Sequence, residues 1–121
     1  MTFGEYVKEK RQTKNITLRA FAEKLGIAPA YMSDIEKSKR NAPTQDILDN
    51  MVVVLNLTND EKNELFDLAA QSKDVVAKDL TEYITDNASV RVALRKAKEN
   101  NIGGDEWIKI IEEMINNKKE N

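Results

Sequence analysis

The stretch that decides the fold reads Thr17-Leu-Arg-Ala-Phe-Ala-Glu-Lys-Leu-Gly-Ile-Ala-Pro-Ala-Tyr-Met-Ser-Asp-Ile35. Apolar residues recur at the helical period before Gly26 and again after Pro29. The first threonine can cap a helix, Gly26 can end that helix in a left-handed conformation, and Pro29 suits the first position of the next. The stretch therefore predicts two short helices joined by a tight turn and set at roughly 90–120° to each other.

The second helix of this pair should have one buried face and one free face. Met32 and Ile35 are expected to face the first helix. Phe21 and Leu25 meet them from that helix, and Ala22 leaves room for a close crossing. The opposite, polar side of the second helix is then expected to stay exposed.

Capping signals predict helices on both sides of this pair. Thr2-Phe-Gly-Glu5 reads as a capping box before a helix that fades near residues 13–15, and Thr44 can cap a fourth helix. Thr58-Asn-Asp-Glu61 reads as a second capping box before a fifth helix. Further helices are predicted over 74–86, 89–99 and 105–117, with a frayed polar end at 116–121. The prediction is an all-α chain: a five-helix domain over residues 1–72, followed by a helical extension of about three helices over 73–121.

Composition narrows the chemistry open to the chain. Its 121 residues are 40% hydrophobic and include no cysteine and no histidine. Disulfides and thiolate metal sites are therefore excluded, and the commonest general base is missing. We expect no enzymatic activity, no metal and no cofactor. The longest apolar run, Met51 to Leu55, is too short to cross a bilayer, and no signal peptide is evident, so we expect a cytoplasmic protein without a membrane partner.

Charge is distributed unevenly along the chain, although the formal net charge is only −2. Residues 1–41 hold nine basic and five acidic side chains, a net charge of +4. Residues 42–70 hold one lysine and six acidic side chains, a net charge of −5. This asymmetry allows one face of the molecule to meet an anionic partner while the whole chain stays near neutral.

Two segments carry a resemblance to a known family: Leu18-Arg-Ala-Phe-Ala-Glu-Lys-Leu-Gly-Ile27 and Tyr31-Met-Ser-Asp-Ile-Glu-Lys-Ser-Lys-Arg40. With the later stretch over 48–57, they resemble the Cro/repressor-like helix-turn-helix regulators of phages and bacteria, also called the xenobiotic-response-element family. The resemblance covers about residues 3–70. It implies a compact five-helix domain that binds double-stranded DNA sequence-specifically, usually as a dimer.

The resemblance also implies roles for individual residues. Those expected to face base edges in the major groove are Pro29, Ala30, Ser33, Asp34 and Lys37. Those expected to contact phosphate are Thr17, Arg19, Tyr31, Lys39, Arg40 and Asn41. Glu36 matches a structural position, and we expect it to pair with Arg19 or with nearby backbone amides.

The sequence departs from the family pattern at three positions. Leu18 stands where glutamine is frequent, and Ala28 stands where a Ser, Thr or Asp cap is usual. Ser38 replaces the usual glycine after the second helix of the motif, and it is strained if that position has a positive φ. The start of this helix also offers no arginine or glutamine, which predicts modest affinity or reliance on DNA shape.

These patterns favour a transcriptional regulator, a repressor that acts as a homodimer on an inverted-repeat operator. The alternative is an antitoxin-type protein-interaction module that also binds DNA. In either case residues 74–117 are predicted to mediate dimerisation or to bind a protein partner, because the first five helices already have a complete core.

Overall fold

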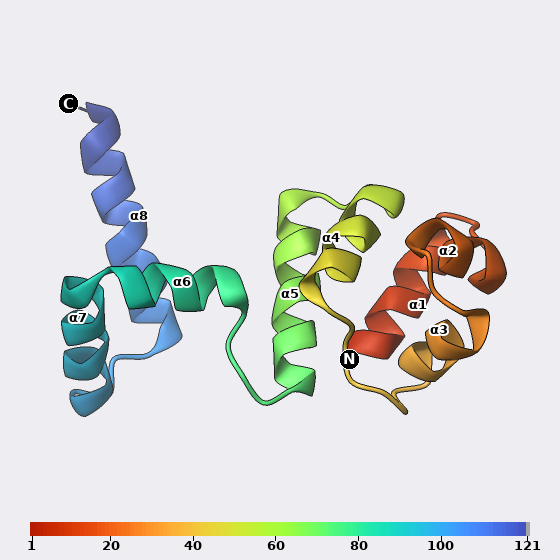
Figure 1. The fold of residues 1–121 in the computed structure, drawn as a ribbon. Helices are drawn as coiled ribbons and strands as arrows, with labels where there is room; N and C mark the ends of the chain where they lie inside the picture. Colours follow the sequence, from red (N-terminus) through yellow and green to blue (C-terminus); the bar gives the residue numbers. More distant parts are fainter. Residues whose placement is uncertain (121) are drawn as a thin grey trace. The chain divides into compact units, whose positions relative to one another are not determined.

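The computed structural model describes residues 1–120, and within them the chain is all-helical (Figure 1). The chain divides into two compact units: the N-terminal unit, Met1–Leu80, and the C-terminal unit, Thr81–Asn121. The first five helices are α1 (Phe3–Thr13), α2 (Leu18–Leu25), α3 (Pro29–Glu36), α4 (Gln45–Val54) and α5 (Asn59–Ser72). The last three are α6 (Lys78–Asp86), α7 (Ala88–Glu99) and α8 (Gly104–Glu120). The predicted all-α class, with five helices followed by three more, is confirmed.

One hydrophobic core holds the five helices of the N-terminal unit together. Helix α1 packs against α3 and α5, α2 packs against α3 and α4, and α4 packs against α5. The largest fully buried side chains are Phe21, Met32, Ile35, Met51, Leu55, Leu65 and Val7. Because every one of the five helices contributes to this set, the position of α3 is fixed by the whole unit.

The starts of α1, α2 and α5 and the end of α2 follow from capping residues. The Thr17 hydroxyl accepts a hydrogen bond from the Ala20 amide at 3.1 Å, and Gly26 ends α2 with φ at 72°. The Thr58–Glu61 capping box forms in full. At Thr2 the hydroxyl accepts from the Glu5 amide, while the Glu5 carboxylate accepts from that same hydroxyl. Thr44 precedes α4 but makes no side-chain capping bond.

The structure differs from the predicted bounds in the second half of the chain. Helix α6 begins at Lys78 and not near 74, because Asp74 takes a positive φ of 56° and the Val75 amide turns back to the Ala70 carbonyl. Helix α8 runs to Glu120, so the predicted frayed end is wrong for residues 116–120; residue 121 lies outside the described residues. Lys118 and Lys119 complement the negative end of the α8 dipole, which helps this helix to continue.

A polar junction joins α1 to the start of α5. The Tyr6 hydroxyl donates to the Glu61 carbonyl at 3.1 Å, and Lys10 Nζ lies 2.7 Å from Glu61 Oε2. The Glu61 carboxylate also accepts from the Thr58 amide at 2.9 Å. These contacts lower the pKa of Glu61 from its usual 4.5 to about 2. The Lys10 hydrogen bond has the largest effect, and the Thr58 amide has the next largest.

This junction makes stability depend on pH in the acid range. Because the folded chain holds the Glu61 carboxylate at a lower pKa than the unfolded chain does, its contribution is present above pH 4.5 and is lost as pH falls towards 2. We expect Glu61→Gln to flatten the acid side of the stability profile, measured by urea unfolding at a series of pH values. Glu64→Gln, three residues further along α5, is the matched control. Equal profiles for the two variants would contradict the assignment.

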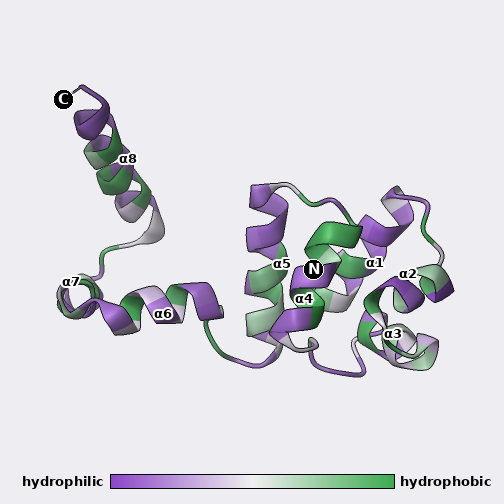
Figure 2. Cartoon of the chain, turned by 45° about the horizontal axis from the view of Figure 1, so that its top comes forward, coloured by the Kyte–Doolittle hydropathy of each residue, from purple (hydrophilic) through white to green (hydrophobic). Residues whose placement is uncertain are grey.

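The C-terminal unit has little core of its own. Among residues 81–120, Ala97 alone is buried, and half-buried side chains such as Trp107 are few. Arg91 Nη1 donates to the Ile84 and Thr85 carbonyls at 2.9 and 2.5 Å, and so ties α7 to the end of α6. Large apolar side chains of this unit remain exposed, including Tyr83, Val92, Ile108, Ile111 and Met114. Helix α8 carries such residues beside hydrophilic ones (Figure 2).

Candidate nucleic-acid interface

Helices α2 and α3 form a two-helix corner with a short turn between them. Gly26 provides the left-handed residue, and its amide donates to the Ala22 and Glu23 carbonyls. The Ile27 amide also donates to the Ala22 carbonyl, at 3.0 Å. Pro29 then opens α3 at the position where a missing amide hydrogen has no consequence. Ala28, the residue before it, makes no side-chain capping bond, which agrees with the departure seen in the sequence.

Helix α3 has a buried face and an exposed face, as its spacing predicted. Met32 and Ile35 are completely buried in the core of the unit. The residues predicted to read bases lie away from the core: Pro29, Ala30 and Lys37 are exposed, and Ser33 and Asp34 are half-buried. Residues 30, 33, 34 and 37 follow the helical spacing of one face. The structure thus brings the predicted readers together on one side of α3; their contact with bases stays a prediction.

The predicted phosphate-contacting residues fall into two groups along the chain. Thr17 and Arg19 are exposed at the start of α2. In the other group, Tyr31 lies in α3, and Lys39, Arg40 and Asn41 lie in the segment that follows it. Of these, Tyr31 is half-buried, and the Arg40 guanidinium lies 5.8 Å from the centre of its ring. We call residues 38–41 the basic loop.

Glu36 is not paired as predicted. Its carboxylate accepts two hydrogen bonds from Arg11 of α1, from Nε at 2.7 Å and from Nη2 at 2.9 Å. The prediction of Arg19 or backbone amides is therefore wrong, since the α1 side chain reaches the end of α3 inside the unit, whereas Arg19 is exposed. Arg11 Nη1 also donates to the Ile16 carbonyl at 2.9 Å. The Glu36 bond raises the pKa of Arg11, so the guanidinium stays charged.

Sequence reasoning missed Arg11 although a signal for it was present. Phe3 and Val7 mark the buried face of α1, and Arg11 is the next residue at the same spacing of four. Both members of the pair are almost fully buried, with Arg11 at 8% and Glu36 at 6% exposure. A charged residue on an apolar helix face requires a buried partner of opposite charge, and Glu36 meets that requirement.

A second missed feature is the glycine at the start of α1. A Cβ on Gly4 would overlap the Ile35 carbonyl oxygen and would lie 2.8 Å from the Glu36 carbonyl oxygen. The backbone of α1 therefore touches the last turn of α3 directly. Together with the Arg11–Glu36 pair, this contact fixes the angle at which α3 is presented.

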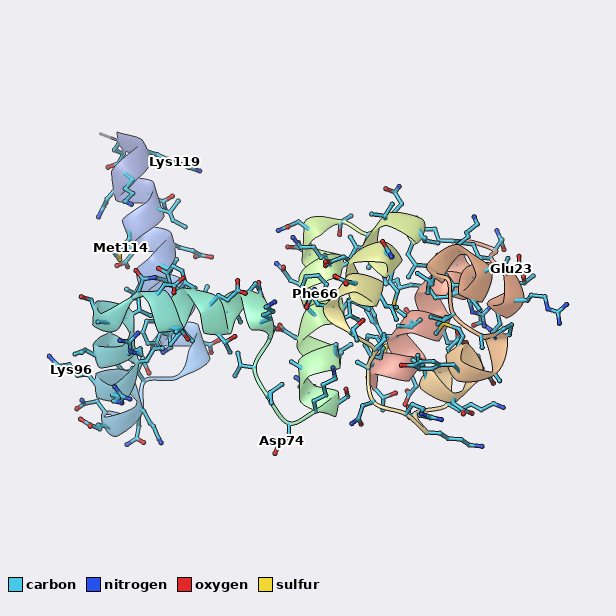
Figure 3. The ribbon with its side chains drawn as sticks, in the orientation of Figure 1. Glu23, Phe66, Asp74, Lys96, Met114 and Lys119 are labelled. Carbon is cyan, nitrogen blue, oxygen red and sulfur yellow. The ribbon has the colours of Figure 1, made fainter. Side chains whose placement is uncertain are left out.

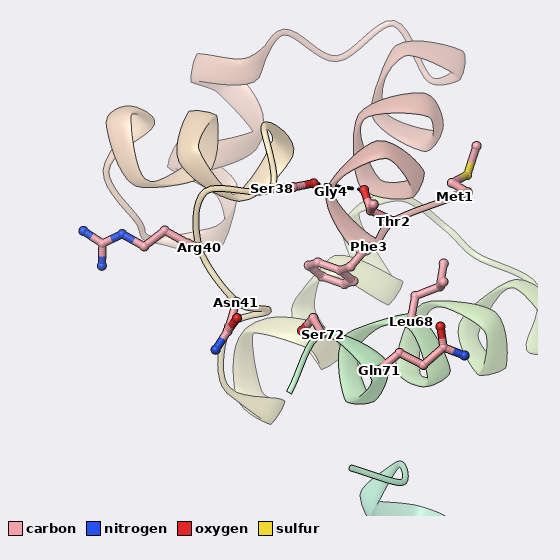
Figure 4. Close-up of a pocket in the computed structure, with 10 residues that line it drawn as sticks. All are labelled: Met1, Thr2, Phe3, Gly4, Ser38, Arg40, Asn41, Leu68, Gln71 and Ser72. Carbon is pink, nitrogen blue, oxygen red and sulfur yellow. Dashed lines mark hydrogen bonds between the residues drawn. The ribbon is translucent and has the colours of Figure 1, made fainter. Parts of the chain in front are cut away.

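Ser38, the second residue after α3, has the positive φ for which the sequence predicts strain. Ser38 has a φ of 62°, in the region that favours glycine. Its hydroxyl lies 3.0 Å from the Thr2 hydroxyl, as Figure 4 shows by a dashed line. The Arg40 side chain in the same view points away from the other labelled residues.

Other kinds of site find little support in the part of the chain described. Within residues 1–120, no group of three or more acidic residues is placed to hold a metal ion. Asp60 and Glu61 lie in the first turn of α5, where carboxylates stabilise the helix dipole. No described helix has the length and apolar character required to cross a membrane.

The corner geometry, the exposed face of α3 and the basic loop define a helix-turn-helix domain. Residues 7–61 match the family model described as helix-turn-helix, which agrees with the resemblance of this segment to the Cro/repressor-like helix-turn-helix regulators. The resemblance seen in the sequence is thereby confirmed.

Two curated relatives are similar to the N-terminal half of the chain. The HTH-type transcriptional regulator SinR of Bacillus subtilis (strain 168) is 34% identical over 65 residues, which are 50% of this chain and 59% of the relative. SinR of Bacillus licheniformis is 33% identical over 55 residues, which are 46% of this chain and 50% of the relative. The matched part thus spans little more than half the length of these relatives.

A solved structure, a complex of the SinR protein and the SinI protein, is similar in fold. It aligns with a TM-score of 0.50 and 20% sequence identity, over 98% of this chain and 99% of that chain. At this identity the likeness concerns the fold alone, and it supports the all-helical assignment.

Proposed function

We propose that this chain is a sequence-specific DNA-binding transcriptional regulator, a repressor that acts as a dimer on an inverted-repeat operator. The observation that carries the proposal is the exposed face of α3, which stands free of the core beside the basic loop. The relatives similar to the N-terminal half are described as transcriptional regulators, which supports the same function. No enzymatic activity is proposed.

In this proposal the start of α3 enters the major groove. Ala30 would pack against a thymine methyl, and Asp34 would accept a hydrogen bond from a cytosine amino group. Ser33 can donate or accept, and Lys37, one turn further on, can reach a base or a phosphate. Since none of these side chains makes the bidentate contact of arginine with guanine, a large share of specificity would come from DNA shape.

Phosphate contacts would supply most of the affinity. The basic loop and the start of α2 would hold the two edges of the groove, and the interaction would weaken as salt rises. The +4 charge of residues 1–41 suits this role, while the −5 charge of residues 42–70 keeps the rest of the N-terminal unit away from the duplex.

Selection from a pool of random duplexes tests the proposal. We expect an enriched palindrome, and we expect Arg40→Ala to reduce the slope of log affinity against log salt by about one. Lys62→Ala, which removes a cation from the acidic part of the N-terminal unit, is the matched control and should leave the slope unchanged. No enriched sequence, together with equal slopes for the two variants, would contradict DNA binding.

Dimerisation would use the C-terminal unit, whose helices lack a core that could stabilise them alone. Helix α8 carries five large exposed apolar side chains: Ile108, Ile110, Ile111, Met114 and Ile115. Their spacing of three and four places them along one side of the helix, and Met114 extends from α8 in Figure 3. An apolar helix face of this size is typical of a surface that another protein segment covers.

The charges at the two ends of α8 favour a second copy of this chain in antiparallel orientation. Asp105 and Glu106 lie in the first turn, and Lys118 and Lys119 lie in the last. An antiparallel pair would bring each acidic end to the basic end of the other copy, whereas a parallel pair would bring like charges together. A dimer with two-fold symmetry also matches an inverted-repeat operator, whose half-sites lie about 34 Å apart.

Light scattering on the full chain tests this dimer. We expect twice the chain mass for the wild type and a single chain mass for Ile111→Asp, because a carboxylate would enter the apolar seam. Asn116→Asp adds the same charge on the polar side of α8 and should remain dimeric. A wild-type mass of one chain would contradict the dimer.

A wild-type monomer would favour the alternative, in which α8 binds a different protein. The solved structure that is similar in fold is a complex of two different proteins, and this supports the alternative of a protein partner. In the antitoxin-type form of that function, the partner would be a small toxin or protease encoded beside this chain. Co-purification of the product of a neighbouring gene with the wild type, and its loss with Ile111→Asp, would support it.

A further inference from the structure

The basic loop borders a cavity that side chains do not fill. A cavity of about 370 Å³ lies behind the loop and is lined by Ser38, Arg40 and Asn41 from the loop side. Phe3 and Leu68 line it from α1 and α5. Figure 4 shows the loop running from Ser38 past Arg40 to Asn41 along one side of this space. Since side-chain packing does not fill the space behind it, the shape of the loop depends on how its two ends are held.

The first end is held by a pair of hydroxyl groups. Ser38 Oγ and Thr2 Oγ1 are 3.0 Å apart. Thr2 already donates its single proton to the Glu5 carboxylate and accepts from the Glu5 amide, so the remaining bond is one in which Ser38 donates. Glycine would suit the φ of 62° at residue 38 better, but it could not make this bond.

The second end is held by a serine at the end of α5. The Ala42 amide, which lies just after the loop, donates to Ser72 Oγ at 3.2 Å, and Ser72 donates in turn to the Ala69 carbonyl at 2.6 Å. Ala42 is only 6% exposed. If the Ser72 hydroxyl were removed, the Ala42 amide would therefore lose its hydrogen-bond acceptor and water would not replace it. Thus α1 holds the loop at one end and α5 holds it at the other.

We propose that Ser38 and Ser72 are positioning residues for DNA binding: their hydroxyls hold the basic loop in the shape that presents Lys39, Arg40 and Asn41 to phosphate. The proposal rests on the proposed function and adds residues that touch no DNA. A loop fixed before binding loses less conformational entropy on the duplex than a mobile one, so the two hydroxyls raise affinity without contacting the ligand.

Ser38→Gly gives the sharpest test because it should lower affinity without lowering stability. Glycine relieves the backbone strain, so the free energy of unfolding should be maintained or raised, whereas the tie to Thr2 is lost. We expect affinity for a mixed-sequence duplex to fall between about twofold and tenfold, as for the loss of one hydrogen bond. The dependence of affinity on salt should become shallower, because a mobile loop holds fewer phosphates.

Ser72→Ala should lower affinity in the same way, and Ser72→Thr, which keeps the hydroxyl, should restore it. Thr13→Ala is the control, since the Thr13 hydroxyl bonds to the Glu9 carbonyl in α1, away from the loop. Amide hydrogen exchange over residues 39–42 of the free full-length chain should quicken in Ser38→Gly and Ser72→Ala and stay unchanged in Thr13→Ala.

Hydrogen exchange of the loop and affinity for the duplex together separate this proposal from the proposed function. Faster loop exchange together with weaker, less salt-dependent binding supports it. Unchanged exchange in both serine variants overturns it, and so does faster exchange with unchanged affinity and salt dependence. A wild-type chain that fails to bind the mixed-sequence duplex even at low salt contradicts the proposed function itself, and with it a DNA-positioning role for these serines.

Discussion

Arg11→Met is expected to lower the free energy of unfolding by about 3–5 kcal/mol, because it leaves the buried Glu36 carboxylate without its partner. Arg11 and Glu36 are joined by two hydrogen bonds of 2.7 and 2.9 Å between α1 and the end of α3. Methionine keeps much of the length of the arginine stem, so the loss concerns charge and hydrogen bonds more than packing. A small domain at the lower end of the usual range of about 5–15 kcal/mol would then be close to unfolding.

Urea unfolding, followed by circular dichroism, measures this effect. Lys10→Met is the matched control, since it removes the neighbouring cation of α1. Lys10 pairs with Glu61 in a more exposed position, and exposed ion pairs contribute about 0–1 kcal/mol to stability. The double variant Arg11→Met, Glu36→Met should be more stable than Arg11→Met alone, because no charge is then left buried. A loss for Arg11→Met no greater than that for Lys10→Met would show that the buried pair does not hold α3.

Gly4→Ala is the second substitution with a large expected effect. Alanine normally stabilises a helix relative to glycine by about 1 kcal/mol, so helix propensity alone predicts a gain. Here the added Cβ would overlap the Ile35 carbonyl oxygen, and both nearby atoms belong to the backbone and cannot rotate away. Since α1 and α3 must move apart, we expect a net loss of about 1–3 kcal/mol in the free energy of unfolding.

The same substitution should also weaken DNA binding, because the contact that it disturbs sets the position of α3. Gly104→Ala is the control: this glycine begins α8, and a Cβ there has nothing within 4 Å. Thermal unfolding and duplex binding of the two variants give the comparison. If Gly4→Ala were as stable as the wild type and bound DNA equally well, the close packing of α1 on α3 would be excluded.

Local signals in the sequence were enough to predict the five-helix domain. Thr17, Gly26 and Pro29 each act through their own backbone and immediate neighbours, so their roles can be read without the fold. The apolar spacing of Met32 and Ile35 likewise identified the buried side of α3, and therefore its exposed side. The positive φ of Ser38 was anticipated from the glycine that the family usually has there.

Contacts between distant segments could not be predicted in the same way. Glu36 pairs with Arg11, 25 residues earlier, and Gly4 meets the end of α3, so both depend on how α1 crosses α3. The ties of the basic loop to Thr2 and Ser72 span 36 and 30 residues. The apolar spacing of α1 marks Arg11 as buried, but hydropathy and capping patterns do not identify its partner, because many polar residues along the chain are equally able to pair with it.

Backbone amide chemical shifts of the labelled full-length chain, recorded while a duplex carrying the selected palindrome is added, test the central claim most directly. The account predicts that the largest changes fall on residues 29–41 and at the start of α2, with small changes in α5. Largest changes on α5 or α8, with residues 29–41 unaffected at saturation, would contradict the claim that the exposed face of α3 and the basic loop bind DNA.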